Sequence, residues 1–205
     1  MPDALLALVA ARRGHFCMES GYHAERWHEL DRLFRDLAKL APFVTALAQR
    51  LAPYGPEVVC GPQTGGAQLA ALLAAELGVP AVDAERFAPM NPTGLFPVKY
   101  RVSDAKRERL RGKAIVLIDD AISAGSAIRA THADLLDCGA RPVALGALFA
   151  FGEPAARFAA DHGLGLEALA ALPFAIWPPG ACPLCAAGAP LETVSDTTSA
   201  ANSTA

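Results

Sequence analysis

The sequence predicts an α/β fold built on an open parallel sheet that is flanked by helices. Three short apolar runs indicate buried strands, at residues 57–60, 114–118 and 143–151. Uninterrupted apolar runs of this length fit strands that are covered on both faces, as in a parallel sheet. Helical patterns lie between these runs, and alternation of strand and helix favours helices on both sides of the sheet.

Three helical segments accompany these strands. Residues 27–51 carry apolar side chains at helical spacing, and we expect this helix to break near Pro42. Residues 67–77 and 126–138 form the other two segments, and each is followed by a glycine, the usual residue at a helix C-terminus.

Two short loops are the best candidates for a ligand site. Residues 60–66 and 119–126 each follow a predicted strand and lead into a predicted helix. Ligands of open α/β sheets bind beyond the carboxyl ends of the strands. We therefore expect these two loops to form the site.

The length and composition fit one domain. The chain has 205 residues, of which 53% are hydrophobic, and it ends in a stretch of small polar residues. We expect a single domain over residues 1–191 and a disordered tail over residues 192–205.

Charge and cysteine content argue against several classes of protein. The formal net charge of −3 gives no general attraction to nucleic acid or to an anionic membrane. No apolar run reaches the roughly 18 residues of a membrane-spanning helix, and the start of the chain lacks the basic region of a signal peptide. Five cysteines, an odd number, do not suggest a disulfide framework. We expect a cytoplasmic protein that binds small molecules and has neither a nucleic-acid nor a membrane partner.

Residues 118–129 combine the parts of a phosphate site. Asp119 and Asp120 end a buried strand, a loop of small residues follows, and a helix begins near Ser126. A helix start presents unpaired backbone N–H groups and the positive end of the helix dipole, to which Ser123 and Ser126 add hydroxyl donors. Carboxylates just before such a loop can accept hydrogen bonds from sugar hydroxyls. The pattern favours a ribose 5-phosphate, and the alternative is that the two acids only end a strand and cap a turn.

Residues 116–131 resemble the phosphoribosyl pyrophosphate (PRPP) signature of the type I phosphoribosyltransferases. Members of that superfamily transfer ribose 5-phosphate from PRPP to a nitrogenous base, with Mg²⁺, and release pyrophosphate. The resemblance implies the type I phosphoribosyltransferase fold. It also implies that Asp119 and Asp120 are catalytic, hold the ribose hydroxyls and meet Mg²⁺ mostly through PRPP and water.

The resemblance further implies which residues bind PRPP. Residues 61–66 lie where the family keeps its pyrophosphate loop. Besides the acid pair, the expected PRPP-binding residues are Ala121, Ser123, Ala124, Gly125, Ser126 and Ala127 in the second loop, and Thr64 and Gly65 in the first.

Residues 96–109 occupy the position of the family's mobile loop, which closes over pyrophosphate. Pyrophosphate leaves as a polyanion, so nearby cations should stabilise it. We expect Lys99 and Arg101 to be the catalytic cations, because they follow Gly94 and Pro97 in a segment that we expect to be mobile. The alternative is a solvated basic loop.

Other segments resemble orotate phosphoribosyltransferase more specifically. Residues 14–21 resemble its early Phe-x-x-x-Ser-Gly segment beside the base pocket, and residues 177–191 resemble the tail of one bacterial branch. The resemblance implies a small hood from about residues 10–40 and 165–191, a homodimer in which a partner loop completes each site, and a role in pyrimidine nucleotide biosynthesis. The expected base-binding residues are Phe16, Ser20, Gly21 and His23.

Departures from the orotate pattern leave two alternatives open. The mobile-loop stretch lacks the Arg-Lys-x-x-Lys-x-His-Gly pattern, Glu19 stands where a lysine is common, and residues 151–153 lack an Asp-Arg pair that helps to hold orotate. Orotate is an anion, so the absence of this lysine and this arginine removes positive charge that would help to bind it. Transfer to orotate remains the first hypothesis. The alternatives are transfer to another base, or a PRPP- or nucleotide-sensing regulator with little turnover.

Cys182 and Cys185 have the spacing of half a zinc ribbon. A structural zinc site needs about four ligands, and the chain has no second Cys-x-x-Cys pair. Metal binding would therefore need histidine ligands or a second subunit. The alternative is a turn with two partly buried thiols.

Overall fold

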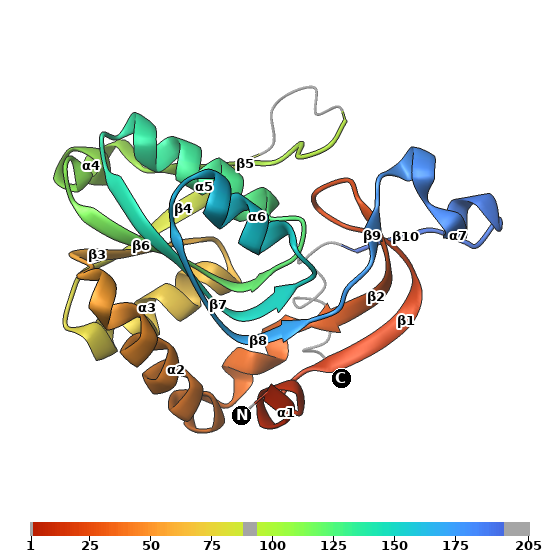
Figure 1. Ribbon diagram of the computed structural model, residues 1–205, viewed down its shortest axis with the longest axis horizontal. Helices are drawn as coiled ribbons and strands as arrows, with labels where there is room; N and C mark the ends of the chain where they lie inside the picture. The colour runs from red at the N-terminus through yellow and green to blue at the C-terminus, as the bar shows by residue number, and fades with distance from the viewer. Residues whose placement is uncertain (1, 88–93, 195–205) are drawn as a thin grey trace, which may run out of the picture.

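The structure, a computed structural model, describes residues 2–87 and 94–194. A six-stranded core sheet has the strand order β5-β4-β3-β6-β7-β8, and a separate four-stranded sheet, which we call the hood sheet, has the order β10-β1-β2-β9. Figure 1 shows the core sheet and its helices on the left and the hood sheet on the right. The predicted α/β class with a parallel sheet between helices is confirmed.

The elements follow one another along the chain with these bounds: α1 (Pro2–Leu6), β1 (Ala10–Cys17), β2 (His23–Glu29), η1 (Leu30–Arg35), α2 (Leu37–Leu51), η2 (Ala52–Tyr54), β3 (Val58–Pro62), α3 (Gly65–Leu77), β4 (Ala81–Phe87), β5 (Lys99–Val102), α4 (Asp104–Arg107), η3 (Glu108–Leu110), β6 (Ala114–Ile122), α5 (Ser126–Asp137), β7 (Arg141–Phe151), α6 (Pro154–Asp161), β8 (Gly165–Leu172), β9 (Ile176–Trp177), η4 (Pro179–Ala181), α7 (Pro183–Ala186) and β10 (Glu192–Thr193). The η elements are 3-10 helices. Among the described residues, none of the helices is long and apolar enough to cross a membrane.

The three predicted strands are β3, β6 and β7, which form the middle of the core sheet. They pair in parallel with one another, and β4 and β8 extend the parallel sheet on either side. All five residues of β3 are buried, as expected for a strand covered on both faces. The edge strand β5 is antiparallel to β4, which is possible because an antiparallel neighbour needs no crossover helix.

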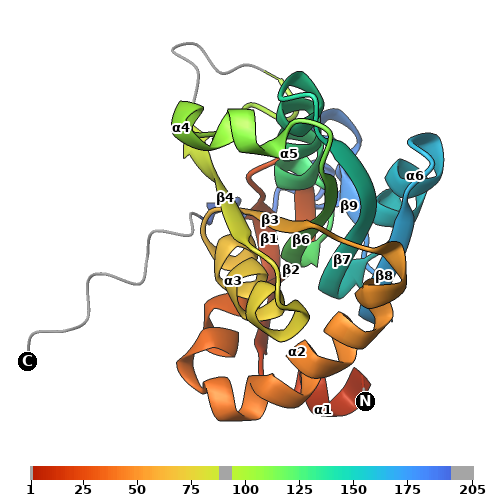
Figure 2. The same ribbon diagram turned by 90° about the vertical axis from the view of Figure 1, so that its left-hand side faces the viewer.

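Helices cover both faces of the core sheet, as Figure 2 shows. Neighbouring strand residues point to opposite faces, so Leu117 and Ile118 of β6 belong to different cores. Ile118 packs in the cluster that contains Leu47 of α2 and other residues of α2 and α3. Leu117 packs in the cluster that contains Leu135 of α5 and Phe158 of α6. This burial on both faces fixes the position of β6, from which the following loop begins.

The helix predicted over residues 27–51 is only partly correct. Strand β2 and the 3-10 helix η1 take up its first part, and α2 begins at Leu37 and continues through Pro42 without a break. Proline removes a backbone donor and leaves the carbonyl four residues earlier without its helical partner. Both Pro42 and Ala38, which carries that carbonyl, are exposed, so water can satisfy the lost hydrogen bond.

The predicted C-terminal boundaries also need correction. Residues 165–172 are strand β8 of the core sheet and not part of the hood, because they pair along β7 and pack against α2 and α6. Glu192 and Thr193 lie in the predicted tail, but they form β10, which pairs with β1. An edge strand such as β1 offers unpaired backbone groups to such a segment. Val194 is also described, and residues 195–205 of the predicted tail lie outside the described residues.

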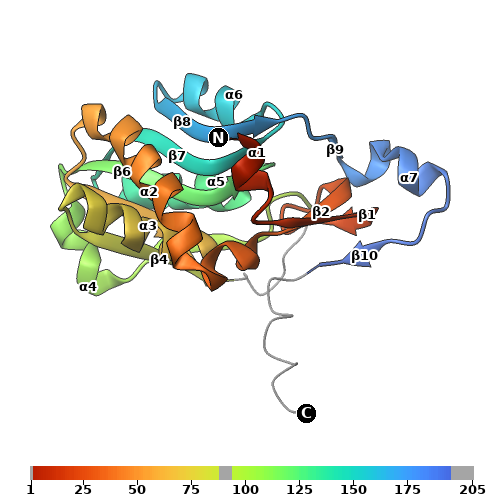
Figure 3. The ribbon, with the colours of Figure 1, turned by 90° about the horizontal axis from the view of Figure 1, so that it is seen from below.

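The direction in which the chain proceeds through the core sheet reverses between β3 and β6. The chain proceeds from β3 outward to β4, whereas from β6 it proceeds in the other direction to β7 and β8. The following helices, α3 and α5, lie on opposite faces of the sheet. A reversal of this kind opens a ligand crevice beyond the carboxyl ends of the two strands. Figure 3 shows the hood strands extending from the core.

Gly146 provides a test of the packing in the core. A Cβ at this position of β7 would lie 2.6 Å from Ile118 Cδ1 and 3.0 Å from Leu51 Cδ1. We expect Gly146→Ala to lower the free energy of unfolding by about 1–3 kcal/mol, because a well-packed core resists added volume. Urea unfolding checks this, with Gly180→Ala as the control, since a Cβ at Gly180 meets no atom within 4 Å. Equal stability of the two variants would contradict the packing described.

Candidate active site

The two acids of the predicted loop lie on strand β6, which continues to Ile122. Asp119 Oδ1 accepts a hydrogen bond of 3.1 Å from the backbone N–H of Asp120. Asp120 Oδ1 accepts one of 2.7 Å from the N–H of Ala121. These local bonds fix the orientation of both carboxyl groups at the carboxyl end of the strand.

The loop after β6 leads directly into helix α5. Gly125 is the residue before the helix, and its φ of +80° is a conformation that glycine adopts without strain. The first hydrogen bond of the helix runs from the N–H of Arg129 to the carbonyl of Gly125. The preceding N–H groups of a helix start have no intrahelical partners and suit an anion. Ser123 and Ser126 are both partly exposed there. The Ser123 hydroxyl can join them, and the Ser126 hydroxyl, which donates to Glu19 in this structure, can do so after it rotates.

The loop after β3 packs directly against the acid pair. A Cβ on Gly65 would lie 2.1 Å from Asp120 Oδ2, and one on Gly66 would lie 2.8 Å from Asp119 Oδ1. The peptide bond between Gln63 and Thr64, in the same loop, is cis. This close approach of backbone to carboxylate requires glycine. The structure thus brings together the two loops that the sequence suggested for the site.

A cleft of about 1180 Å³ extends from these loops to the hood sheet. Its lining includes nearly all the residues expected to bind PRPP: Thr64, Gly65, Asp119, Asp120, Ala121, Ser123, Gly125, Ser126 and Ala127. Ala124 does not line this cleft and is buried. From the hood sheet and the turn after β1, the cleft is lined by Arg12, Met18, Glu19, Ser20, Arg26, Trp27, His28 and Glu29.

Of the four residues expected to bind the base, Ser20 lines the cleft. Phe16 is buried, with 1% of its surface exposed, and Gly21 packs against the backbone of Gly94. His23 lies against His15, with 3.0 Å between His23 Nδ1 and His15 Nε2. Phe16, Gly21 and His23 are therefore not among the described residues that line the cleft.

The expected catalytic cations lie on the edge strand β5. Lys99 is exposed, and Arg101 forms an ion pair of 2.7 Å with Asp104. Neither is among the described residues that line the cleft. The structure therefore does not bring Lys99 or Arg101 to the acid pair within one chain.

Glu19 is a site residue that the sequence showed only as a departure from a family pattern. Its carboxylate accepts hydrogen bonds of 2.8 Å from Arg86 Nε, 3.1 Å from the Tyr100 hydroxyl and 3.1 Å from Ser126 Oγ. Burial, together with the charge of Glu19, raises the pKa of Tyr100, so its hydroxyl remains a donor. Glu19 thus connects the hood to β4, β5 and the start of α5.

Negative charge accumulates at the carboxyl end of β6. The pKa of Asp119 is raised well above its usual value, first by burial and then by the charges of Asp120 and Glu19. Such a site favours a bound cation. Carboxylate oxygens are among the ligands that Mg²⁺ prefers, so this donor set fits a magnesium ion.

The hood side of the cleft carries a cation and flat rings. The Nε of Arg26 is buried and has no hydrogen-bond partner among the described residues; the nearest carboxylate, that of Glu25, is 3.7 Å away. The ring of His28 stacks on Phe151 with 4.5 Å between ring centroids, and Phe174 lies next to both rings. Arg26 and His28 were not predicted as site residues, because β2, which carries them, is formed by pairing with strands distant in the sequence, and its last residues, 27–29, were predicted to be helical.

Comparison with known protein families decides the assignment. The model of the phosphoribosyl transferase domain matches residues 26–162. The chain belongs to this family. This phosphoribosyltransferase is 28% identical to the orotate phosphoribosyltransferase of Thermotoga maritima over 184 aligned residues. The alignment covers 89% of this chain and 90% of the relative. It is 25% identical over 186 residues to that of Caldanaerobacter subterraneus, with 90% of each chain covered.

Solved structures show the same fold. The orotate phosphoribosyltransferase of Aeropyrum pernix matches with a TM-score of 0.61 and 24% identity, over 80% of this chain and 88% of that one. An adenine phosphoribosyltransferase from Thermoanaerobacter pseudethanolicus matches with a TM-score of 0.64 and 17% identity, over 84% of this chain and 100% of that one. The type I fold expected for this phosphoribosyltransferase is therefore confirmed.

Proposed function

We propose that this phosphoribosyltransferase transfers ribose 5-phosphate from PRPP to orotate and releases pyrophosphate. The observation that carries the proposal is a single cleft with two chemically different ends. The end at the core sheet presents an acid pair and two loops that lead into helices, and the end at the hood presents stacked rings and a guanidinium group. The curated relatives, which bear the name orotate phosphoribosyltransferase, favour orotate as the base.

The core end suits PRPP. Ser123, Ser126 and the first N–H groups of α5 would bind the 5-phosphate. Asp119 and Asp120 would accept hydrogen bonds from the ribose hydroxyls. Thr64 and Gly65, at the start of α3 and beside the acids, would bind the pyrophosphate group. Bound magnesium would neutralise charge on the leaving pyrophosphate.

The acid pair also suits the transition state. Substitution at the anomeric carbon develops positive charge on the sugar, as in glycoside cleavage. Asp119 and Asp120 would hold the ribose so that their negative field lies close to that charge. Carboxylates fixed in advance by backbone hydrogen bonds can stabilise this charge without reorganising.

The hood end suits a flat anion. Orotate is a planar ring with a carboxylate, so the ring can pack on the aromatic group around His28 and Phe151. Arg26 lines the cleft, and its guanidinium group can bind the carboxylate. Arg26 would thereby replace cations that this chain lacks at the positions used by orotate enzymes.

Arg26→Ala tests this role. We expect the KM for orotate to rise about tenfold or more, because a charge-assisted hydrogen bond to the substrate is lost, while the KM for PRPP changes little. Steady-state kinetics with each substrate varied in turn measure both values. Arg111→Ala, which removes an exposed arginine outside the cleft, is the control. An unchanged KM for orotate in Arg26→Ala would remove Arg26 from the base site.

Glu19 favours a second candidate, transfer to a different base. Its carboxylate lines the cleft and could accept hydrogen bonds from an amino group of a base such as adenine. In that case Glu19 would select the base, and Arg26 would not contact it. A third outcome is a regulator that binds PRPP without turnover.

A panel of bases separates these outcomes. Pyrophosphate release from PRPP with Mg²⁺ is measured with orotate, uracil, adenine, hypoxanthine, guanine and xanthine. Turnover with orotate alone supports the proposal. Turnover with another base keeps the transfer reaction and replaces the substrate. The absence of turnover with every base, together with PRPP binding, indicates a regulator.

We also infer a homodimer. The leaving pyrophosphate needs cations, but Lys99 and Arg101 lie outside the cleft of their own chain. A second copy could present these side chains to the cleft. Light scattering at working concentration tests this, because a monomer with full activity would contradict it.

A further inference from the structure

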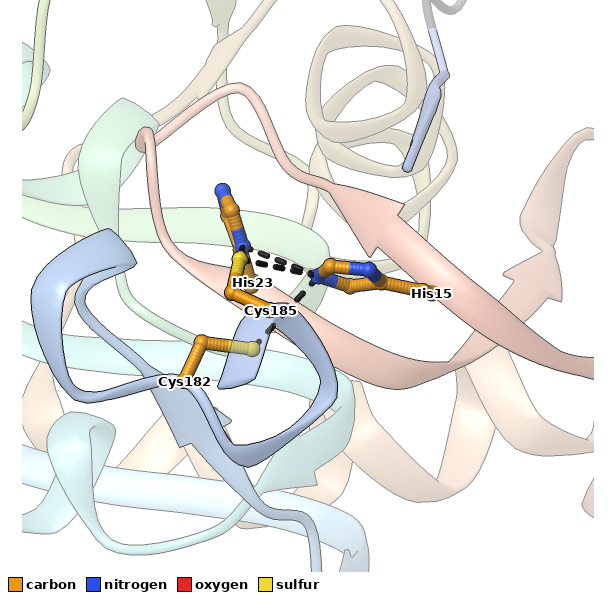
Figure 4. A group of neighbouring side chains, drawn as sticks. All are labelled: His15, His23, Cys182 and Cys185. Carbon is orange, nitrogen blue, oxygen red and sulfur yellow. Dashed lines mark hydrogen bonds between the residues drawn. The ribbon is translucent and has the colours of Figure 1, made fainter. Parts of the chain in front are cut away.

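We propose that His15, His23, Cys182 and Cys185 bind a zinc ion that fastens the C-terminal segment to the hood sheet. Each of the four residues offers one ligand atom, and these atoms all lie within 4.8 Å of one another. Figure 4 shows the four side chains pointing toward a common centre.

The fold brings these ligands from distant parts of the chain. His15 lies on β1, and His23 lies on the adjacent antiparallel strand β2. Cys182 immediately precedes the short helix α7, and Cys185 lies within it. Residues three apart on a helical turn share one side of it, so both thiols face the two histidines. The cysteine pair supplies half of a four-ligand site, and the histidines supply the other half.

The distances between ligand atoms fit a tetrahedral zinc site. His15 Nε2 lies 3.0 Å from His23 Nδ1, 3.4 Å from Cys182 Sγ and 3.6 Å from Cys185 Sγ. Cys185 Sγ lies 3.2 Å from His23 Nδ1. With usual Zn–N and Zn–S bond lengths, the edges of a tetrahedron are about 3.3–3.8 Å long. These four spacings are therefore within a few tenths of an ångström of the tetrahedral edges, and the two remaining pairs of ligand atoms lie within 4.8 Å of each other.

A contact behind His15 sets which of its nitrogens can bind metal. His15 Nδ1 lies 2.9 Å from the backbone carbonyl of Ala189. A carbonyl only accepts hydrogen bonds, so Nδ1 carries the proton and Nε2 presents a lone pair to the cluster. This arrangement is common behind metal-binding histidines. One lone pair cannot accept from His23, Cys182 and Cys185 together, whereas one metal ion satisfies all four groups.

The chemistry of the ligands selects zinc. Three of the four residues are nine-tenths or more buried: His15, His23 and Cys182 are 4%, 4% and 3% exposed. Two thiolates would neutralise the charge of a divalent cation in this mostly buried site. Sulfur and imidazole nitrogen suit zinc, whereas magnesium prefers oxygen. The site is thus chemically distinct from the acid pair on β6.

The zinc ion would hold a wall of the cleft in place. The C-terminal segment joins the hood through β9 and β10, and each of these strands contributes only two residues to the pairing. Such short pairings hold a segment weakly. Glu192, Thr193 and Val194, which follow the cysteine pair, line the cleft. A metal bond between the segment and β1 and β2 would therefore keep this wall closed over the hood end.

Metal analysis of the full-length protein tests the site. We expect about one zinc ion per chain after purification without chelators, and less than about a tenth of that in Cys182→Ser/Cys185→Ser. The control is Cys17→Ser, which removes a thiol outside the cluster, from strand β1, which also carries His15. This variant should keep the full zinc content. Zinc that is absent from the wild type and not taken up on addition, or zinc that is retained by the double variant, would overturn the proposal.

Cobalt provides a second readout that does not depend on the folding of a variant. Replacement of zinc by Co²⁺ in the wild-type chain should give the visible bands of a tetrahedral ion and a near-ultraviolet thiolate-to-cobalt band. A chelator should lower the melting temperature of the wild type and leave that of the double variant unchanged. A disulfide between Cys182 and Cys185, seen as the loss of two free thiols without bound metal, would contradict the site.

Discussion

In the double variant Asp119→Asn/Asp120→Asn, we expect kcat for phosphoribosyl transfer to fall about a thousandfold. The substitution keeps the size and shape of both side chains but removes two charges from the end of β6. These charges are proposed to hold the ribose and to stabilise positive charge on the sugar in the transition state. Pyrophosphate release with saturating PRPP and base measures the loss.

The control for this pair is Asp137→Asn. Asp137 is an exposed carboxylate at the end of α5, on the helix that begins at the proposed phosphate loop. Its substitution should leave kcat unchanged. If the double variant kept kcat within a few-fold of the wild type while Asp137→Asn behaved in the same way, the acid pair would have no part in the reaction.

Gly65→Ala is expected to lower kcat/KM for PRPP by about a hundredfold, because small displacements of reacting groups are costly in rate. A Cβ on Gly65 would lie 2.1 Å from Asp120 Oδ2, so the carboxyl group must move. A side chain can rotate away at little cost to folding. The expected result is therefore a large loss of activity with a small change in melting temperature.

Gly146→Ala gives the opposite pattern and serves as the matched comparison. Both substitutions add one methyl group at a crowded glycine. In the core the neighbours are Ile118 and Leu51, which are fully buried. We therefore expect stability to fall while kcat of the folded molecules is retained. Equal loss of stability in both variants, with equal activity, would show that Gly65 does not position the acid pair.

The middle of the core sheet could be predicted from the sequence because its signal is local. Residues 114–118 are an uninterrupted apolar run, and the acids, small residues and helix start follow within a few positions. Local patterns of small and apolar residues also predicted the helix after this loop. They predicted the end of the earlier helix α3 at Gly78, which adopts a left-handed conformation there. Burial on both faces and the chemistry of a helix start are properties of short segments, so they are visible in a sequence.

The hood could not be predicted in this way, because long-range contacts form it. Strand β2 has no clear alternation of apolar and polar residues, and its strand partners come from both ends of the chain. His15 and Cys182 are 167 residues apart in sequence, so the cysteine pair looked like half of a zinc site. The roles of Glu19 and Arg26 likewise depend on which residues meet across the cleft.

Calorimetric titration with PRPP in the presence of Mg²⁺ tests the central claim most directly. The claim is that the loop from Asp119 to Ser126 is the PRPP site. We expect the wild type to bind one PRPP per chain, and Asp119→Asn/Asp120→Asn and Gly65→Ala to bind it much more weakly, while Gly146→Ala and Asp137→Asn bind it as the wild type does. Undiminished binding in the acid-pair and Gly65 variants would contradict the claim and place PRPP elsewhere.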